Sequence, residues 1–404
     1  MNSVELFAGA GGLSLGLEKA GWESQLLLER NRHACNTLQY NKDKKHPLAK
    51  NWKIIEGDVR DFDYDQIKSE IDLVAGGPPC QPFSLGGKHN AYSDDRDMFP
   101  EAIRAVKELG PKYFVFENVK GLLRSSFSAY FNYIILRLKF PFEGKRESED
   151  WQSHFKRIKD IELNRLDHGS SFVYRVSYKL INAADYGVPQ HRHRVIIVGI
   201  REDQGWNYQF PEPTHSEEGL LRQKYIDNTY WTDKAIALDN DLNAYKNLRG
   251  RVAKISSLVN KASLKRFQTV HDAVNDLPVP YAGGNEEYGN HIFRPGAKPY
   301  PGHTGSRLHF PSKAIKAGTH GVPGGENMIA YSDGSYRYYT TREAARIQTF
   351  PDNYIFTGSW TESMRQIGNA VPVRLGYILG ASLMRQAIAG NNEIRKEEST
   401  LQPA

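Results

Sequence analysis

The stretch that decides the fold lies near the start of the chain and reads Val4-Glu5-Leu6-Phe7-Ala8-Gly9-Ala10-Gly11-Gly12. The mostly apolar residues up to Phe7 predict a short buried strand, and the glycines after it predict a turn into a helix. Such glycines let a ligand approach the backbone, and the N-terminus of a helix favours a carboxylate or a phosphate. The stretch therefore predicts a ligand-binding loop between the first strand and the first helix of an α/β sheet.

Short apolar runs of the same kind recur through residues 1–200. They are typical of parallel strands that are buried on both faces. Helical patterns lie between some of them, such as Leu13, Leu17 and Ala20 before the stop signal Gly21. We therefore expect an α/β fold built on a doubly wound, mostly parallel sheet. The expected strands are Val4–Phe7, Gln25–Leu28, Lys53–Ile55, Asp72–Ala75, Tyr113–Phe116 and Val195–Ile200.

Polar side chains follow four of these strands directly. Glu29 and Asp58 come after the second and third strands, and the pairs Pro79-Cys80 and Glu117-Asn118 come after the next two. In open α/β sheets, ligands bind outside the carboxyl ends of the strands. Four strands thus deliver polar chemistry to one edge, which is the main indication from the residues that the protein is an enzyme.

The composition is that of a globular protein. The 404 residues are 39% hydrophobic and 25% charged, which excludes a disordered, collagen-like or integral membrane protein. Two cysteines exclude a disulfide framework and a cysteine-based zinc site, and we expect no metal. The sequence shows no secretory signal, so we expect a cytoplasmic protein. The net charge of +6 permits a polyanionic partner without demonstrating one.

The character of the chain changes between about 205 and 338. Tyr281 to Gly325 contains ten glycines and five prolines, which indicates loops and turns. After it a helix is expected at Thr341–Gln348, a turn at Gln366–Val373, and a last apolar helix face. We therefore expect a first domain of 1–204 and 339–390, a second domain of 205–338 and a polar tail of 391–404.

A basic stretch lies inside the second domain. Tyr245–Phe267 carries seven Lys or Arg residues and no acid, and Val252 and Ile255 keep helical spacing within it. A basic amphipathic helix suits contact with phosphates, but a solvated helix face explains the pattern equally well. The residues alone leave both interpretations open.

The first loop and the second strand together predict a nucleoside cofactor. Glu29 lies 20 residues after Gly9, where an acid can bind ribose hydroxyls. A dinucleotide fingerprint would need a third glycine at position 14, which is Ser14, so NAD is disfavoured. Asp58 could accept the amino group of an adenine, or it could simply cap the end of a strand.

The sharpest feature is the stretch Gly76-Gly77-Pro78-Pro79-Cys80-Gln81-Pro82-Phe83-Ser84. It holds Cys80 in a stiff loop at the ligand edge, where a nucleophile is expected, although a thiol there must be activated by its surroundings. Glu117 at the end of the next strand completes a nucleophile and acid pair. In Gln190-His191-Arg192-His193-Arg194, the two-residue period of a strand would place Gln190, Arg192 and Arg194 on one face.

These motifs, in this order, resemble those of the DNA cytosine-5 methyltransferases of bacterial restriction-modification type. The resemblance covers nearly all of 1–120, 172–200 and 336–388. It implies a fold that binds S-adenosyl-L-methionine, with 205–338 as the target-recognition domain. The matching motifs are Phe7–Gly12, Glu29, Gly57-Asp58, Pro78–Gln81, Glu117–Val119, Gln190–Arg194, Arg342–Asp352 and Gln366–Val371.

The resemblance also implies roles for single residues. The Cys80 thiolate would add to carbon 6 of a flipped-out cytosine, and Glu117 would protonate ring nitrogen 3. Arg194 would hold the cytosine carbonyl and orient Glu117, while Arg192 would position the Cys80 loop or a phosphate. Gln190 completes the implied catalytic set. The implied cofactor-binding residues are Phe7, Ala8, Gly9, Gly11, Gly12, Glu29, Asp58, Val59, Pro79 and Asn369.

Three alternatives remain beside a DNA methyltransferase. An RNA cytosine-5 methyltransferase of the same architecture shares the motifs, but 205–338 is larger than a transfer-RNA enzyme should need. A nucleotide-dependent oxidoreductase leaves Cys80 and Glu117 without a role. A non-catalytic DNA-binding protein is disfavoured because nothing catalytic is missing. The expected partners are double-stranded DNA and, functionally, a cognate restriction endonuclease; we expect no membrane partner and a monomer.

Overall fold

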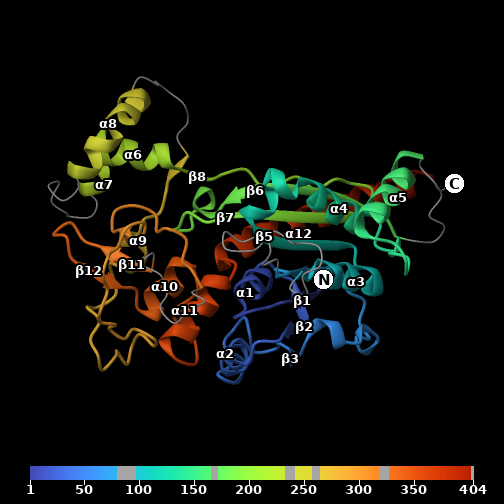
Figure 1. The fold of residues 1–404 in the computed structure, drawn as a ribbon, viewed down its shortest axis with the longest axis horizontal. Helices are drawn as coiled ribbons and strands as arrows, with labels where there is room; N and C mark the ends of the chain where they lie inside the picture. The colour runs from blue at the N-terminus through green and yellow to red at the C-terminus, as the bar shows by residue number, and fades with distance from the viewer. Residues whose placement is uncertain (80–96, 165–171, 233–241, 257–263, 318–326, 402–404) are drawn as a thin grey trace. The chain divides into compact units, whose positions relative to one another are not determined.

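The computed structural model describes residues 1–79, 97–164, 172–232, 242–256, 264–317 and 327–401 (Figure 1). The chain divides into two compact units. Unit 1 consists of Met1–Ile181, His193–Pro211 and Gly376–Ala404, and unit 2 consists of Asn182–Arg192 and Glu212–Leu375. This grouping differs from the expected boundaries, because 182–192 and 339–375 group with the segment that was expected to form the second domain.

Seven strands form one sheet in the order β3-β2-β1-β4-β5-β7-β6. The pairs β1–β2, β1–β4, β2–β3 and β4–β5 are parallel, and β5–β7 is antiparallel. The expected α/β fold with a mostly parallel sheet is thereby confirmed. The strand order reverses between β1 and β4, where sheets of this kind bind ligands. The strands are β1 (Asn2–Leu6), β2 (Glu23–Glu29), β3 (Ile54–Glu56), β4 (Leu73–Gly76), β5 (Tyr113–Val119), β6 (Tyr174–Asn182) and β7 (His193–Arg201).

Helices cover both faces of this sheet. On one face, Leu6 and Phe116 pack in a single apolar cluster with Phe99 and Ile134 of α3 and α4. On the other face, Trp22 meets Tyr113 edge-on and donates its ring N–H to a carbonyl of α12. The helices of unit 1 are α1 (Gly12–Lys19), α2 (Arg32–Asp43), α3 (Phe99–Leu109), α4 (Ser128–Lys139), α5 (Trp151–Asn164) and most of α12 (Val373–Leu401).

Two glycines at the ligand edge cannot carry a side chain. Gly11 precedes α1 with a φ of 78°, and a Cβ there would lie 2.8 Å from Leu38. Gly76 ends β4, and a Cβ there would lie 2.3 Å from the carbonyl oxygen of Leu6 in β1. The two strands therefore approach closely at the point where the chain turns toward the predicted nucleophile loop.

Unit 2 contains small sheets and short helices. Strands β10, β11 and β12 form one sheet, and β8 and β9 form another. Its strands are β8 (His215–Ser216), β9 (Lys265–Arg266), β10 (Ser306–Arg307), β11 (Met328–Ala330) and β12 (Tyr336–Tyr338). Its helices are α6 (Glu217–Tyr225), α7 (Thr229–Thr232), α8 (Leu242–Ser256), α9 (Val270–Val274), α10 (Thr341–Ile347) and α11 (Trp360–Asn369).

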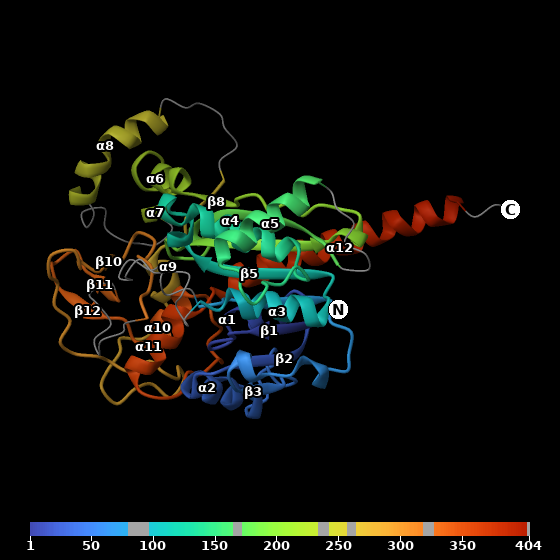
Figure 2. The ribbon, with the colours of Figure 1, turned by 45° about the vertical axis from the view of Figure 1, so that its right-hand side comes forward.

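One sequence-based expectation about the C-terminal region was wrong. Gln366 to Asn369 belong to α11 instead of a turn, because Ser359 caps this helix by accepting the Glu362 N–H, and the helix then runs to Asn369. The expected polar tail has helical backbone, since α12 continues to Leu401 (Figure 2). No helix among the described residues is both long enough and apolar enough to span a bilayer.

Glu5 is a buried carboxyl in the middle of the sheet. It accepts a hydrogen bond of 2.6 Å from the Ser14 hydroxyl, and burial raises its pKa from 4.5 to about 8. Between these two values the folded chain binds more protons than the unfolded chain, so the free energy of unfolding falls as pH rises.

We therefore expect Glu5→Gln to gain stability relative to the wild type as pH rises from 4.5 to about 8. Urea unfolding at both ends of this range measures the gap between the two proteins. Glu23→Gln, which removes an exposed carboxylate from β2, is the matched control. A gap that stays constant with pH would contradict the assignment of the titrating group to Glu5.

Candidate active site

The glycine loop and Glu29 form one connected structure at the carboxyl ends of β1 and β2. Phe7 and Gly9 have left-handed φ values of 56° and 54°. The Glu29 carboxylate accepts the Gly9 N–H at 2.8 Å and the Asn31 N–H at 2.6 Å. A carboxylate offers about four lone-pair sites, so two of them remain for hydroxyl donors. The space beside Gly9 is open, because a Cβ there would meet nothing within 4 Å.

Asp58 has more partners than the sequence indicated. Arg60 donates through its backbone N–H and its guanidinium, and Arg30 adds a contact of 3.1 Å to Oδ2. The Arg60 hydrogen bonds hold the pKa of Asp58 well below its usual range. Four donors therefore occupy the lone pairs of the Asp58 carboxylate. Arg30 is exposed and donates only once, so it is the donor that an adenine amino group would replace most easily.

Glu117 and Arg194 form the central ion pair of this edge. Because β7 runs antiparallel to β5, its first residues meet the last residues of β5. Glu117 lies opposite Ile196, two residues after Arg194, so the two side chains share a face. Arg194 Nε lies 2.6 Å from Glu117 Oε1, and the Glu117 side chain is 11% exposed. The two side chains are therefore in direct contact, and the orientation of Glu117 by Arg194 stays a prediction.

The backbone that leads to Cys80 is attached to the same strand. The Asn118 amide donates to the Pro78 carbonyl at 3.0 Å, and a Cβ on Gly77 would lie 3.4 Å from Glu117 Oε2. Pro79 is exposed, and its carbonyl accepts the Met98 N–H. Cys80 and the residues that follow it up to 96 lie outside the described residues. Asn118, near the end of β5, thus ties the backbone before Cys80 to this strand.

Gln190 and Arg192 occupy a different environment from the one expected. β7 begins only at His193, so the two residues precede the strand and do not share a strand face with Arg194. Arg192 is 1% exposed, which leaves no access for a phosphate. Its guanidinium donates to the carbonyls of Gly368 and Ala370, both at 2.9 Å.

Gln190 belongs to the same buried group. Its side chain accepts the Ile315 N–H and donates to Gln348, and Gln348 donates to the Ile367 and Ala370 carbonyls. Arg192 and Gln348 therefore fix the backbone on both sides of Asn369, which is exposed at the end of α11 and remains a predicted cofactor contact. These contacts also explain why 182–192 group with unit 2. Sequence reasoning missed Gln348, although it stands within the Arg342–Asp352 motif.

Comparison with known proteins identifies the family. The sequence model of the C-5 cytosine-specific DNA methylases matches residues 1–140 and 154–385. The chain belongs to this family. Residues 141–153, which reach into the first turn of α5, lie between the two matched ranges.

Among the curated relatives are two bacterial type II methyltransferases. M.PspPI of Psychrobacter sp. is 33% identical over 396 residues, covering 97% of this chain and 80% of its own. M.Eco47II of Escherichia coli is 34% identical over 388 residues, covering 94% of this chain and 78% of its own.

Solved structures share the fold at lower identity. A DNMT2 variant from Spodoptera frugiperda matches with a TM-score of 0.54 and 16% identity over 95% of this chain and 99% of its own. The methyltransferase EhMeth of Entamoeba histolytica matches with a TM-score of 0.54 and 15% identity over 96% of this chain and 98% of its own.

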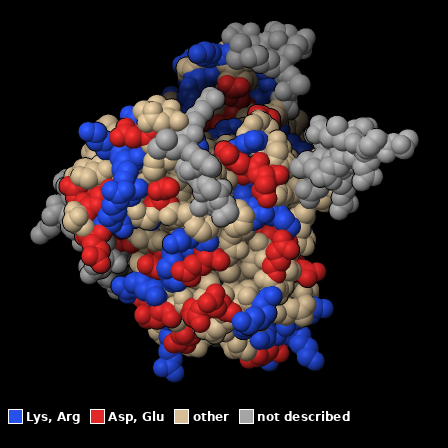
Figure 3. All heavy atoms as spheres, turned by 90° about the vertical axis from the view of Figure 1, so that its right-hand side faces the viewer, with Lys and Arg blue, Asp and Glu red and all other residues tan. Residues whose placement is uncertain are grey.

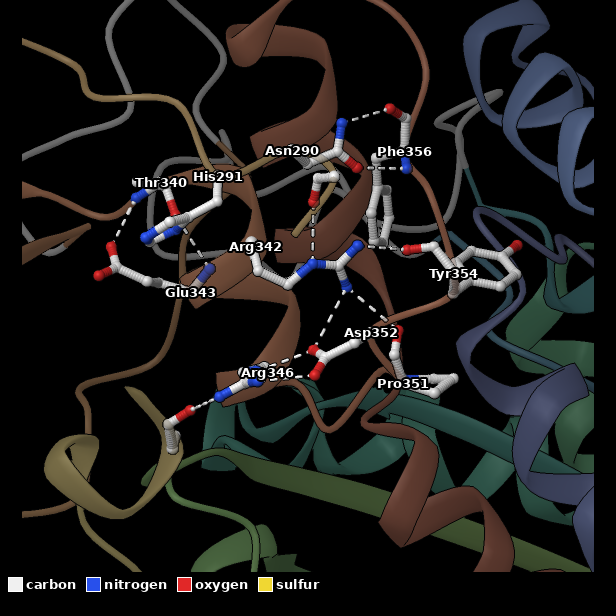
Figure 4. A network of polar contacts seen from close by, with 12 residues as sticks. Asn290, His291, Thr340, Arg342, Glu343, Arg346, Pro351, Asp352, Tyr354 and Phe356 are labelled. Atoms are coloured by element: carbon white, nitrogen blue, oxygen red, sulfur yellow. Dashed lines mark hydrogen bonds and ion pairs between the residues drawn. The ribbon is translucent and has the colours of Figure 1, made fainter. Parts of the chain in front are cut away.

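In this methylase, Arg342 organises the core of unit 2 (Figure 4). Its fully buried guanidinium donates to the carbonyls of Gly289, Pro351 and Tyr354. Burial lowers its pKa to about 10, so the group still carries its charge at neutral pH. The Thr340 hydroxyl and the Glu343 carboxylate cap α10 reciprocally, and this Thr-x-x-Glu signal was present in the sequence.

We expect Arg342→Met to lower the free energy of unfolding by about 3 kcal/mol or more, because three buried carbonyls lose their donor. Chemical unfolding followed by fluorescence measures the loss. Arg365→Met is the matched control, since Arg365 pairs with Glu362 at the surface and such a pair contributes about 1 kcal/mol or less. Equal losses in the two variants would show that the Arg342 contacts add nothing beyond a surface pair.

Proposed function

We propose that the protein transfers a methyl group from S-adenosyl-L-methionine to carbon 5 of a flipped-out cytosine in a short double-stranded DNA sequence. We further propose that it is the protective methylase of a restriction-modification system. The observation that carries the chemistry is the Glu117–Arg194 pair beside the backbone that leads to Cys80. Membership of the C-5 cytosine-specific DNA methylase family supplies the reaction class, and the names of the type II relatives support the biological setting.

The loop after β1 fits the cofactor. The open space beside Gly9 admits a bulky ligand, and the Glu29 carboxylate keeps lone pairs for ribose hydroxyls. The other proposed cofactor contacts of unit 1 follow the ends of β1, β3 and β4 in the sequence; they are Phe7, Ala8, Gly11, Gly12, Asp58, Val59 and Pro79. When bound, S-adenosyl-L-methionine supplies a methyl group that is activated by a positively charged sulfur.

Cys80 and Glu117 act on the cytosine ring in concert. The Cys80 thiolate forms a bond to carbon 6, and the ring electrons move toward nitrogen 3, where Glu117 delivers a proton. Carbon 5 becomes electron-rich and takes up the methyl group. Loss of the carbon 5 proton to a base then restores the double bond between carbons 5 and 6 and expels the Cys80 thiolate. Ring nitrogen 3 returns its proton to Glu117, so the enzyme ends in its starting state.

Arg194 has two tasks in this scheme. Its guanidinium keeps the Glu117 carboxyl in place through the 2.6 Å contact, and its remaining N–H groups can donate to the cytosine carbonyl. Arg192 and Gln190 act at a distance from the ring, by fixing the backbone around Asn369.

Partners follow from the same proposal. Base readout is assigned to side chains of the 205–338 segment, which acts as the target-recognition domain. The protein works as a monomer on DNA, and a cognate restriction endonuclease shares its target sequence without needing to bind it.

The deciding experiment incubates the protein with labelled S-adenosyl-L-methionine and either unmethylated bacteriophage DNA or transfer RNA. Label in DNA, released as 5-methylcytosine after base analysis, is the expected result, and bisulfite sequencing then gives the target site. Label only in RNA would reassign the substrate to the alternative class while keeping the chemistry. Absence of label in both, with cofactor bound, would overturn the proposed activity.

A further inference from the structure

Helix α8 presents a basic face that the proposed chemistry does not use. Val252 and Ile255 are buried toward α6, while Lys246, Arg249 and Lys254 are exposed. The helix contains no acidic residue between Leu242 and Ser256. Figures 1 and 2 both show α8 beside α6.

Specific contacts fix the orientation of α8. Arg251 makes a bidentate ion pair with Glu217 of α6 through contacts of 3.0 and 2.7 Å. Arg222 of α6 donates to the carbonyl of Ile255 at 3.4 Å. Arg251 is therefore held in the contact with α6, and Lys246 and Arg249 lie exposed on the other side of α8. Within the described part of the chain, no carboxylate pairs with Lys246 or Arg249.

Gly250 stands in the centre of this face. Lys246, Gly250 and Lys254 are four residues apart and form one row along the helix, with Arg249 beside it. A glycine is unfavourable in a helix interior, and here no neighbour requires it, because a Cβ would meet nothing within 4 Å. Because Gly250 has no side chain, the backbone of an extended polyanion can come close to the helix between the neighbouring cations.

The dimensions of the row match one strand of DNA. Eight residues of α-helix span about 12 Å, over which one strand of a duplex carries roughly three or four phosphates. Lys and Arg at the two sides of a glycine gap can contact neighbouring phosphates of such a strand. The alternative interpretation, in which these cations only form a solvated helix face, does not explain why a glycine stands at position 250.

We propose that the face formed by Lys246, Arg249, Gly250 and Lys254 contacts the sugar-phosphate backbone of DNA and adds affinity that is independent of sequence. The inference rests on the proposed function in that DNA is the substrate. Phosphate contacts of this kind position a protein on the duplex and make its affinity depend on salt.

The test measures binding of the full chain to a mixed-sequence duplex over a series of salt concentrations. Lys246→Gln/Arg249→Gln is expected to reduce the slope of log affinity against log salt by about 2, roughly one for each phosphate contact. Cofactor affinity and the rate at saturating DNA should stay at the wild-type level. The control Lys156→Gln/Lys159→Gln removes the same charge from α5 in unit 1, where both side chains are exposed. Acidic and basic side chains are interspersed on the face of the molecule drawn in Figure 3, where α5 is turned toward the viewer.

Gly250→Ala is the second arm. Alanine favours the helix, so the variant should be at least as thermally stable as the wild type and yet bind DNA several-fold more weakly. A double variant whose slope equals those of the wild type and the α5 control would overturn the proposal, and wild-type affinity in Gly250→Ala would overturn close approach at the glycine. Methylation by the wild type in the same preparation separates these results from failure of the proposed function.

Discussion

Replacing Cys80 by alanine is expected to abolish methyl transfer to DNA, with a loss on the order of 10⁴-fold or more. Without the thiolate, carbon 6 receives no electron pair, and carbon 5 of cytosine is too weak a nucleophile to take up the methyl group. DNA binding and cofactor binding should persist, because the contacts around Glu29 and the whole of unit 2 are unchanged. Transfer of label from S-adenosyl-L-methionine to DNA measures the loss.

The chain offers a matched control in its other cysteine. Cys35 is buried in α2, where its thiol donates to the Glu29 carbonyl and burial raises its pKa to about 12. Cys35→Ala should keep methylation, since this thiol is protonated at neutral pH. DNA that carries 5-fluorocytosine gives an independent readout, because the fluorine cannot leave as a proton does and the covalent adduct persists. Methylation by the Cys80→Ala protein would overturn the mechanism.

Replacing Glu117 by glutamine should reduce the rate of transfer by about 10² to 10⁴-fold, the range typical of a lost general acid. Glutamine keeps the size of the side chain but cannot deliver a proton to ring nitrogen 3. It also replaces the ion pair with Arg194 by a neutral contact. Single-turnover transfer to DNA measures the effect on the chemical step.

Glu162→Gln is the control for loss of a paired carboxylate. Glu162 lies in α5 and pairs with Lys139 of α4 at 2.7 Å. It should leave the rate at the wild-type level. A Glu117→Gln protein that transfers methyl groups within a few-fold of the wild type would exclude Glu117 as the acid and leave it with a structural role.

Most strands of the large sheet could be predicted from the sequence, because each is visible as a local run of apolar residues. Buried parallel strands are short apolar runs, and the polar residue after each run marks the edge where ligands bind. The register of β5 and β7 then brings Glu117 and Arg194 into contact, a pairing that the motifs implied but only the antiparallel arrangement explains.

The environments of Arg192 and Gln190 could not be predicted in the same way. A two-residue period assumes a strand, and β7 begins one residue after Arg192 and three residues after Gln190. The carbonyls that Arg192 contacts lie 176 and 178 residues away, and no local rule identifies such partners. The expected turn at Gln366–Val373 was wrong in its first four residues, because they complete the helix that Ser359 caps.

The short segment 182–192 has a consequence for attempts to exchange specificity between relatives. Unit 2 is discontinuous, so a chimaera that transplants only 212–375 leaves behind the residues that satisfy its buried backbone. The transplanted segment would then fold correctly only if the host protein has a glutamine and an arginine at the positions equivalent to 190 and 192. A chimaera should therefore carry 182–192 together with 212–375, with the junctions of the short segment placed between Ile181 and Asn182 and between Arg192 and His193.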